Sequence, residues 1–436
     1  MIRLNNQIKL KNITKVLGSR TFASSSSDFS SLIANSKNGI KVAALDSKKD
    51  GLMGSVSIVI NAGSRFESLD NIGASHYLKA FGFRNSAKST SFRKVREAEL
   101  QGAILSSSVG RENVVYSVEC FKQDIPYFLT NLSEMVTSTL YNPWEFDEIN
   151  GLVHLESSIA NANPQTFLTE KLHQAGFRSG LGNSIYASFP NQIEGSETVK
   201  AFSDSRIGSN TVAVVGTGID SSELVKLVDS SVLSKLAAVN VSSSSPSKFH
   251  SGTESHTNVS GSVAHYALAF QASDPTTAAL LSECLGTQSH LKWGNGTSPL
   301  SAIALKHGAQ VNAFSSSYSD ASIVGVMVSS SANNISEVVR LVAQAIKDMA
   351  NGKISEATFG RALSSAKMRS HIATETQAGQ RNALTNTVFG NSTISAQQLE
   401  SASLQSALSA ASTAFSVKPT VASLGSSMVI PYLDTL

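Results

Sequence analysis

The sequence predicts an α+β fold made of two tandem domains of one design, each a largely antiparallel sheet with helices packed on it. An internal repeat recurs about half the chain apart, and each copy reads strand, turn, strand, helix. A Ser/Pro-rich stretch at 240–247 separates the two copies and has the composition of a linker. We therefore expect a first domain over residues 24–238, a linker over 239–250 and a second domain over 251–436.

The repeat supplies two strands and one helix to each half. Strands alternate apolar residues with period two, as at Val114, Tyr116 and Val118, whereas the helices repeat them at spacings of three and four. In chain order, the strand, strand and helix are expected at 102–108, 114–120 and 125–135, and again at 308–314, 323–328 and 335–349.

Further strands begin and end the halves. A strand is expected at 55–60, with Val56, Ile58 and Ile60 on one face, and its counterpart at 262–270 opens the second half. Residues 211–218 read as a strand, and Asp220 then has the position and chemistry of a helix N-cap.

Composition excludes several classes of protein. The chain has 436 residues, of which 41% are hydrophobic, so it can bury a sizeable core. No apolar run approaches the roughly 18 residues needed to span a bilayer, so we expect no transmembrane segment. Cys120 and Cys284 lie far apart without a CxxC pair, which argues against a disulfide scaffold and fits a reducing compartment.

Residues 1–23 have the composition of a mitochondrial presequence. They contain basic residues and no acid, with a serine run directly after them. The basic residues are Arg3, Lys9, Lys11, Lys15 and Arg20. Without these five, 30 basic residues remain against 32 acidic ones, a net charge of −2. Such a chain lacks the basic stripe that nucleic-acid binding requires.

Residues 62–83 contain a pattern typical of a zinc-binding helix. Gly63, Ser64, Arg65 and Glu67 are followed by Gly73, His76, Leu78 and Phe83. This stretch resembles the zinc-helix region of the pitrilysin-type (inverzincin) metallopeptidases, whose motif is H-x-x-E-H. In that motif two histidines on one helical face bind Zn²⁺, the glutamate activates a water, and a glutamate on a later helix is the third protein ligand.

The motif is degenerate in this chain. His76 holds the first ligand position, but Lys79 replaces the glutamate that acts as the base, and Ala80 replaces the second histidine. The distal ligand position falls on Glu156. Because a catalytic zinc site needs three protein ligands, we expect an inactive site with no catalytic residue and no bound metal. A metal would need His154 or another histidine to enter the site.

The sequence lacks other signatures of chemistry. It has no phosphate-binding GxxxxGK[ST] loop and no GxSxG nucleophile elbow, and Gly294-Asn-Gly296 reads as a turn. It also lacks CxxCH and a four-cysteine set, so no haem or iron–sulfur ligation is expected. We therefore expect no cofactor.

Among mitochondrial members of the family, residues 313–320 and 323–325 resemble the core proteins of ubiquinol–cytochrome c reductase (complex III). The region from Trp293 lacks the long glycine-rich loop of the non-catalytic processing-peptidase subunit. The resemblance implies a structural subunit on the matrix side of the inner membrane, without a transmembrane segment. Its implied partners are core protein 1, cytochrome b, cytochrome c₁, the Rieske iron–sulfur protein and small subunits.

Two other functions remain open from the sequence. The first is a catalytic or non-catalytic subunit of a zinc processing peptidase, which would cleave presequence peptides in a chelator-sensitive way. The second is a soluble matrix module that binds extended peptides between its domains without hydrolysing them.

Overall fold

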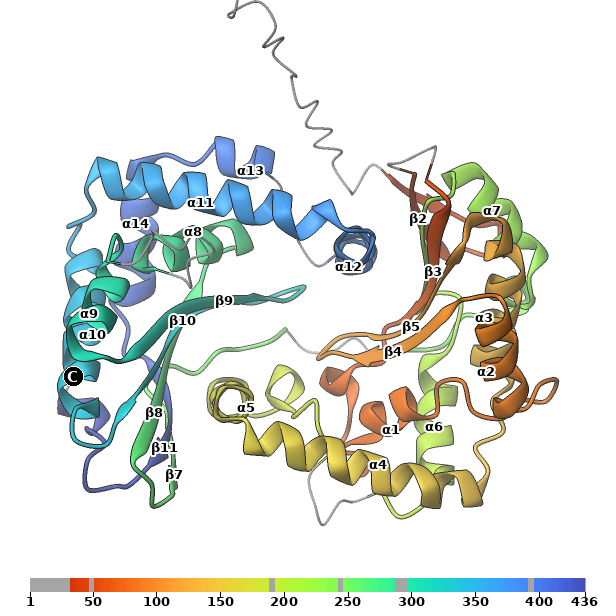
Figure 1. The fold of residues 1–436 in the computed structure, drawn as a ribbon, viewed down its shortest axis with the longest axis horizontal. Coiled ribbons are helices and arrows are strands. Elements are labelled where there is room, and N and C mark those ends of the chain that lie inside the picture. The colour runs from red at the N-terminus through yellow and green to blue at the C-terminus, as the bar shows by residue number, and fades with distance from the viewer. Residues whose placement is uncertain are drawn as a thin grey trace, which may run out of the picture.

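The computed structural model describes residues 32–46, 51–187, 193–241, 246–286, 296–390 and 396–435. The expected presequence at 1–23, part of the expected linker and Trp293 lie outside these residues. Two sheets, each flanked by helices, form two halves that face one another (Figure 1). This arrangement confirms the predicted fold class.

The two sheets share one strand arrangement. In spatial order, the first sheet contains β1 (Ile33–Asn35), β2 (Lys41–Leu45), β6 (Val212–Thr217), β3 (Met53–Ile60), β5 (Val114–Phe121) and β4 (Ile104–Val109). The second contains β7 (Glu254–Asn258), β11 (Thr420–Gly425), β8 (Val263–Ala272), β10 (Ser322–Ser331) and β9 (Gln310–Ser317). Only the β2–β6 and β7–β11 pairs among these strands are parallel, at equivalent places in the two sheets.

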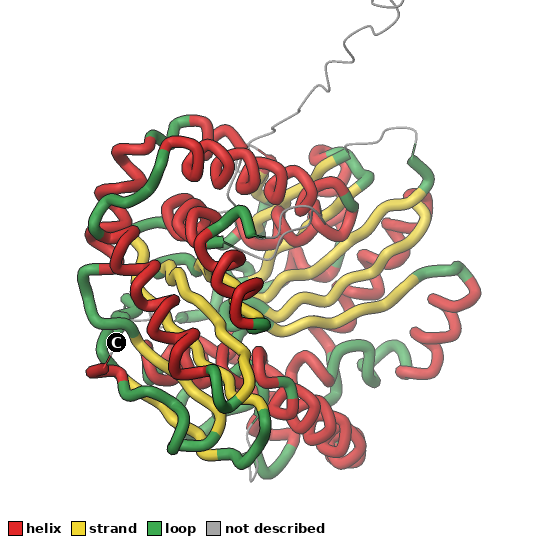
Figure 2. Tube along the Cα trace, turned by 60° about the vertical axis from the view of Figure 1, so that its left-hand side comes forward, coloured by secondary structure: helices red, strands yellow, loops and turns green. Residues whose placement is uncertain are grey.

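Helices surround both sheets (Figure 2). The first half contributes α1 (Ala74–Ala80), α2 (Ser91–Leu100), α3 (Ile125–Ser138), α4 (Pro143–Ala162), α5 (Pro164–Phe177), α6 (Ser196–Arg206) and α7 (Ser221–Ser230). The second contributes α8 (Pro275–Leu285), α9 (Pro299–His307), α10 (Ile335–Ala350), α11 (Glu356–Glu375), α12 (Gln377–Val388), α13 (Ala396–Glu400) and α14 (Leu404–Phe415). Short 3₁₀ turns are η2 (Ser64–Phe66), η3 (Lys122–Asp124), η4 (Gly180–Gly182), η5 (Val232–Lys235) and η6 (Leu433–Thr435).

The repeat appears in the structure as predicted. β4, β5 and α3 in the first half correspond to β9, β10 and α10 in the second. Val56, Ile58 and Ile60 of β3 enter one core cluster together, as their alternation predicts. Asp220 caps α7 by accepting a hydrogen bond from the backbone N–H of Ser222.

One helix of each half packs on the sheet of the other half. Leu168 and Leu172 of α5 pack on Ala267 and Ile323 of the second sheet. In return, Leu384 and Val388 of α12 pack on Val59, Ala213 and Val215 of the first sheet. Both sheets are therefore covered on two faces, which explains why β3 and β6 are buried along almost their whole length.

The end of the expected linker is fixed to the first half. The backbone N–H of His250 donates to the Gly176 carbonyl over 2.7 Å, and Phe249 stacks edge-on against Phe177.

Within the described part of the chain, no helix combines the length and the apolar character needed to cross a bilayer.

Candidate functional site

The helix that carries the degenerate motif, α1, is positioned by a buried carboxylate. Glu67 accepts hydrogen bonds from the backbone N–H groups of Gly73 and Ser75, at 2.9 and 2.8 Å. Gly73 adopts φ +96°, a left-handed conformation that favours glycine, and so turns the chain into the helix. Burial raises the pKa of the Glu67 carboxyl, although these bonds lower it. The retained Gly and Glu of the motif thus set the start of α1.

His76 has both ring nitrogens occupied. Its side chain is 1% exposed. The backbone N–H of Ala187 donates to Nδ1 over 3.2 Å, and Nε2 lies 2.7 Å from Oε2 of Glu156. Because Nδ1 accepts, the neutral ring carries its proton on Nε2 and donates it to Glu156. Burial lowers the pKa of His76, which keeps the ring neutral, and nearby Lys79 also lowers it.

Lys79 and Glu156 form an ion pair beside His76. The Lys79 ammonium lies 2.8 Å from each carboxylate oxygen of Glu156. Burial acts to raise the pKa of Glu156, but the bonds from Lys79 and His76 outweigh it, so this pKa is lowered. Ala80, one residue further along α1, is nearly buried and has no ligand atom. The structure therefore brings His76, Lys79 and Glu156 together.

These residues do not fit a catalytic zinc ion. His76 has no free lone pair, and the Glu156 carboxylate is already neutralised by an ammonium group, which would also repel a dication. Lys79 cannot take a proton from water while it is charged. Over the described ranges, no three His, Cys, Asp or Glu side chains are grouped as a metal site.

His154 does not complete the site. It is exposed on α4 and lies two residues before Glu156, so the two side chains leave the helix on different faces. His173 is buried and serves another purpose: its Nδ1 lies 2.7 Å from the Thr169 carbonyl, and its Nε2 lies 2.7 Å from the Tyr318 hydroxyl of the second half.

Sequence reasoning missed a polar junction between the halves. The β9–β10 turn places Asp320 against Arg65, whose Nη1 and Nη2 donate to the two carboxylate oxygens over 2.8 and 2.5 Å. Glu112 binds Arg65 at 2.7 Å and accepts from the Ser319 hydroxyl at 2.6 Å. The sequence contained two signals of this junction, the retained Arg65 and the family-like stretch 313–320. Neither signal indicated that Arg65 and Asp320 are in contact.

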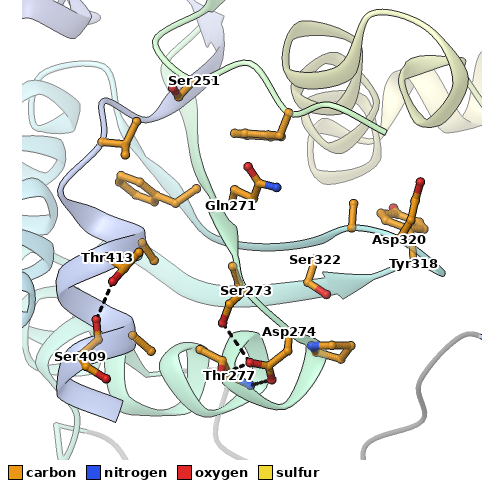
Figure 3. Close-up of a pocket in the computed structure, with 18 of the residues that line it drawn as sticks. Ser251, Gln271, Ser273, Asp274, Thr277, Tyr318, Asp320, Ser322, Ser409 and Thr413 are labelled. Carbon is orange, nitrogen blue, oxygen red and sulfur yellow. Dashed lines mark hydrogen bonds between the residues drawn. The ribbon is translucent and has the colours of Figure 1, made fainter. Parts of the chain in front are cut away.

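A pocket of about 820 Å³ lies in the second half (Figure 3), and its lining does not include His76, Lys79 or Glu156. Hydroxyl side chains such as Ser251, Ser322 and Thr413 line it. Its two carboxylates are already engaged, because Asp274 caps α8 through Thr277 and Asp320 binds Arg65. The size is typical of a ligand pocket, but no convergent catalytic groups line it.

Comparison with known proteins identifies two matching family models. Residues 42–188 match the insulinase family (peptidase family M16), and residues 196–365 match the inactive domain of peptidase family M16. The second match begins before the expected linker and ends within α11.

Similar proteins cover nearly the whole chain. Cytochrome b-c1 complex subunit 2 of Cryptococcus neoformans is 31% identical over 92% of this chain and 93% of its own. The human protein of that name is 26% identical over 92% and 90%. A probable mitochondrial-processing peptidase subunit alpha-1 of Arabidopsis thaliana is 26% identical over 76% and 68%.

Proposed function

Because the chain belongs to peptidase family M16, we propose that it is a non-catalytic core subunit of mitochondrial complex III. In this role it corresponds to core protein 2, cytochrome b-c1 complex subunit 2, and supports the assembly and stability of ubiquinol–cytochrome c reductase. The relatives of that name align over about nine-tenths of both chains. The processing-peptidase relative aligns over a smaller share of each chain.

One observation carries the non-catalytic assignment. The Lys79 ammonium binds both oxygens of Glu156 at 2.8 Å, on the carboxylate that would be the third zinc ligand. Lys79 replaces the glutamate that acts as the base in the family motif, and Ala80 replaces the second histidine; neither side chain binds the metal or accepts a proton. The family fold is thereby preserved without the chemistry of its active members.

The partners belong to this proposal. We place the chain beside core protein 1, with cytochrome b, cytochrome c₁, the Rieske protein and small subunits as further neighbours, on the matrix side of the inner membrane. Support comes from the names of the relatives and from the basic, acid-free segment 1–23. We also retain the expected domains 24–238 and 251–436, although α5 and α12 each pack on the opposite sheet.

The test compares assembly with proteolysis. Cells lacking the protein should lose assembled complex III on native gels and still remove presequences, and the tagged chain should co-migrate with complex III subunits identified by mass spectrometry. Zinc-dependent cleavage of presequence peptides by the purified chain, alone or with its partner, would instead favour a processing-peptidase subunit. An unchanged amount of complex III in those cells would refute the proposal.

A further inference from the structure

Strand β8 continues past the end of its neighbour β11. β8 pairs with β10 as far as Ala272, which lies opposite Ser322, but β11 begins only at Thr420, opposite Ala269. The last three residues of β8 therefore have a paired edge toward β10 and an unpaired edge on the other side. Such an edge presents backbone N–H and C=O groups to which another extended chain can bind.

The register shows that the main chain of Gln271 points toward the unpaired edge. The backbone N–H of Ala332 donates to the Ser262 carbonyl, and the β8–β10 register continues without a bulge to Ala272. Hydrogen-bonded and non-hydrogen-bonded positions alternate along an antiparallel pair, so Ser262 and Ala272 point toward β10 and Gln271 points away from it. Among the described residues, none forms a hydrogen bond with the backbone N–H or C=O of Gln271.

The unpaired edge opens into the pocket of about 820 Å³. Gln271 lines this pocket together with Val417 and Lys418. Lys418 is the residue that would lie opposite Gln271 if β11 continued, so the pocket occupies the place of a missing strand partner. The side-chain amide of Gln271 lies in the pocket as well (Figure 3). Ser322 of β10 also lines it, and among the described residues its hydroxyl has no hydrogen-bond partner.

The charged groups of the pocket are already engaged. Asp274 accepts hydrogen bonds at the start of α8, Asp320 binds Arg65, and the Lys418 ammonium lies 3.3 Å from a carboxylate oxygen of Asp434. A phosphate or a metal ion would therefore find no free counter-charge. The groups left to bind a ligand are the neutral donors and acceptors of Gln271 and Ser322, which match a peptide backbone.

Helix α14 supplies a wall of small side chains. They are Ser406, Ser409, Ala410, Thr413 and Ala414. The three hydroxyl groups in this set donate to carbonyls of the same helix or its N-cap, as from Ser409 to Ser406 and from Thr413 to Ser409. The wall thus leaves room for a chain to approach closely but directs no free donor at it.

We propose that this pocket binds an extended segment of another polypeptide, whose backbone pairs with the N–H and C=O of Gln271 as an added strand. A strand presents such a pair of groups on the same side at every second residue, which is the pattern that β11 leaves unfinished. Main-chain bonds supply the affinity in this mode of recognition, and the small residues of α14 select small side chains on the segment that faces them.

The experiment uses Gln271→Pro in the full-length protein, expressed in cells that lack the natural copy. Proline removes the N–H that faces the pocket and no bond to β10, and a strand tolerates proline at such a position. Ser315→Pro in β9 is the matched control. The N–H of Ala313 donates away from β10, to Gly286, so that of Ser315 also faces the outer edge, and Ser315 does not line the pocket.

A photo-reactive amino acid at Ser409, an exposed position on the pocket wall, identifies the occupant by mass spectrometry of its adducts. The adducts should map to one contiguous segment of another polypeptide. Their yield should fall about tenfold for Gln271→Pro and stay unchanged for Ser315→Pro, which corresponds to about 1.4 kcal/mol of binding free energy.

A second variant decides the matter if Gln271→Pro does not fold. Thr413→Trp fills the pocket from an exposed position on α14 and leaves β8 intact, so it should also abolish the adduct. Ser412→Trp is its control, because Ser412 is exposed on the same helix and does not line the pocket.

Several results would overturn the inference. They are an adduct yield that Thr413→Trp or a folded Gln271→Pro leaves unchanged, adducts only with lipid or only with this chain itself, and no adduct at all. The adduct is read on any polypeptide, so this test does not depend on the proposed function. Failure of the chain to co-migrate with complex III would refute that function and leave this result standing.

Discussion

Arg65 and Asp320, 255 residues apart in the chain, form a two-bond ion pair that joins the two halves. The Arg65 side chain is 5% exposed, and it also binds Glu112 of its own half. The backbone N–H of Ser247, near the end of the expected linker, donates to the same Asp320 carboxylate. Asp320 of the β9–β10 turn thus binds both Arg65 of the retained motif and the end of the expected linker.

Asp320→Asn should destabilise the protein by about 1–2 kcal/mol. The change removes one of the carboxylates that bind the nearly buried Arg65 guanidinium. Because Asp320 is partly exposed, the loss of stability is smaller than for a fully buried ion pair. Chemical denaturation at pH 7 measures the effect. Asp348→Asn removes one partner of the exposed Lys353 pair and should change stability little. Equal effects of the two substitutions would contradict a special role for the junction.

Lys79→Met should cost about 1–2 kcal/mol of unfolding free energy. The Glu156 carboxylate would lose its ammonium partner in a partly buried site, so its pKa should also rise. Lys88→Met, which breaks the more exposed pair with Glu134, is the control. Urea titration of both variants measures the difference, and a Lys79 variant as stable as the wild type would show that the pair is dispensable.

The double substitution Lys79→Glu/Ala80→His should at most restore zinc binding, and not efficient proteolysis. It recreates two histidines at i and i+4 and removes the positive charge, so Glu156 can serve as the distal ligand. Calorimetric zinc titration should show binding that Ala80→His alone lacks, because that variant keeps the ammonium. Rapid zinc-dependent cleavage of a presequence peptide by the double variant would contradict this expectation.

Stability should fall as the pH drops from 7 to 5, with His173 as one source. Burial lowers the pKa of His173 to about 3, whereas an unfolded histidine titrates near 6.5. Below about pH 6.5 the unfolded state therefore binds a proton that the folded state does not, and each further pH unit costs about 1.4 kcal/mol until the folded pKa is reached. His173→Gln should reduce the slope of unfolding free energy against pH by up to the amount that one bound proton contributes. The substitution His371→Gln, at an exposed position, should leave the slope unchanged. Denaturation midpoints measured between pH 7 and pH 5 give this slope. If the His173→Gln variant had the same slope as the wild type, His173 would be protonated in the folded state and the expectation would be wrong.

The two halves should not fold independently. A fragment ending at residue 241 lacks α12, so Val59, Ala213 and Val215 would face water. We expect it to aggregate alone and to become soluble when fragment 246–436 is co-expressed. Leu384→Ala in the full chain should cost about 2–5 kcal/mol, because this buried side chain lies at that contact. A monomeric fragment with its own cooperative melting transition would refute the expectation.

The sequence by itself determined the repeated elements and the loss of the active site. Alternating residues such as Val56, Ile58 and Ile60 specify strands locally, because a period of two places them on one buried face. The identities of Lys79 and Ala80 do not depend on tertiary contacts, and the inactive site follows from the chemistry of these two side chains.

The tertiary structure alone decided which surfaces meet. The apolar sides of α5 and α12 carry no information about which sheet they cover, and only folding placed each on the opposite half. The same holds for Arg65 and Asp320, and for the proton on His76, which depends on the Ala187 N–H and the Glu156 carboxylate. Local patterns determine single elements because they act over a few residues. These contacts join groups that are far apart in the chain, 255 residues for Arg65 and Asp320, and no spacing in the sequence indicates them.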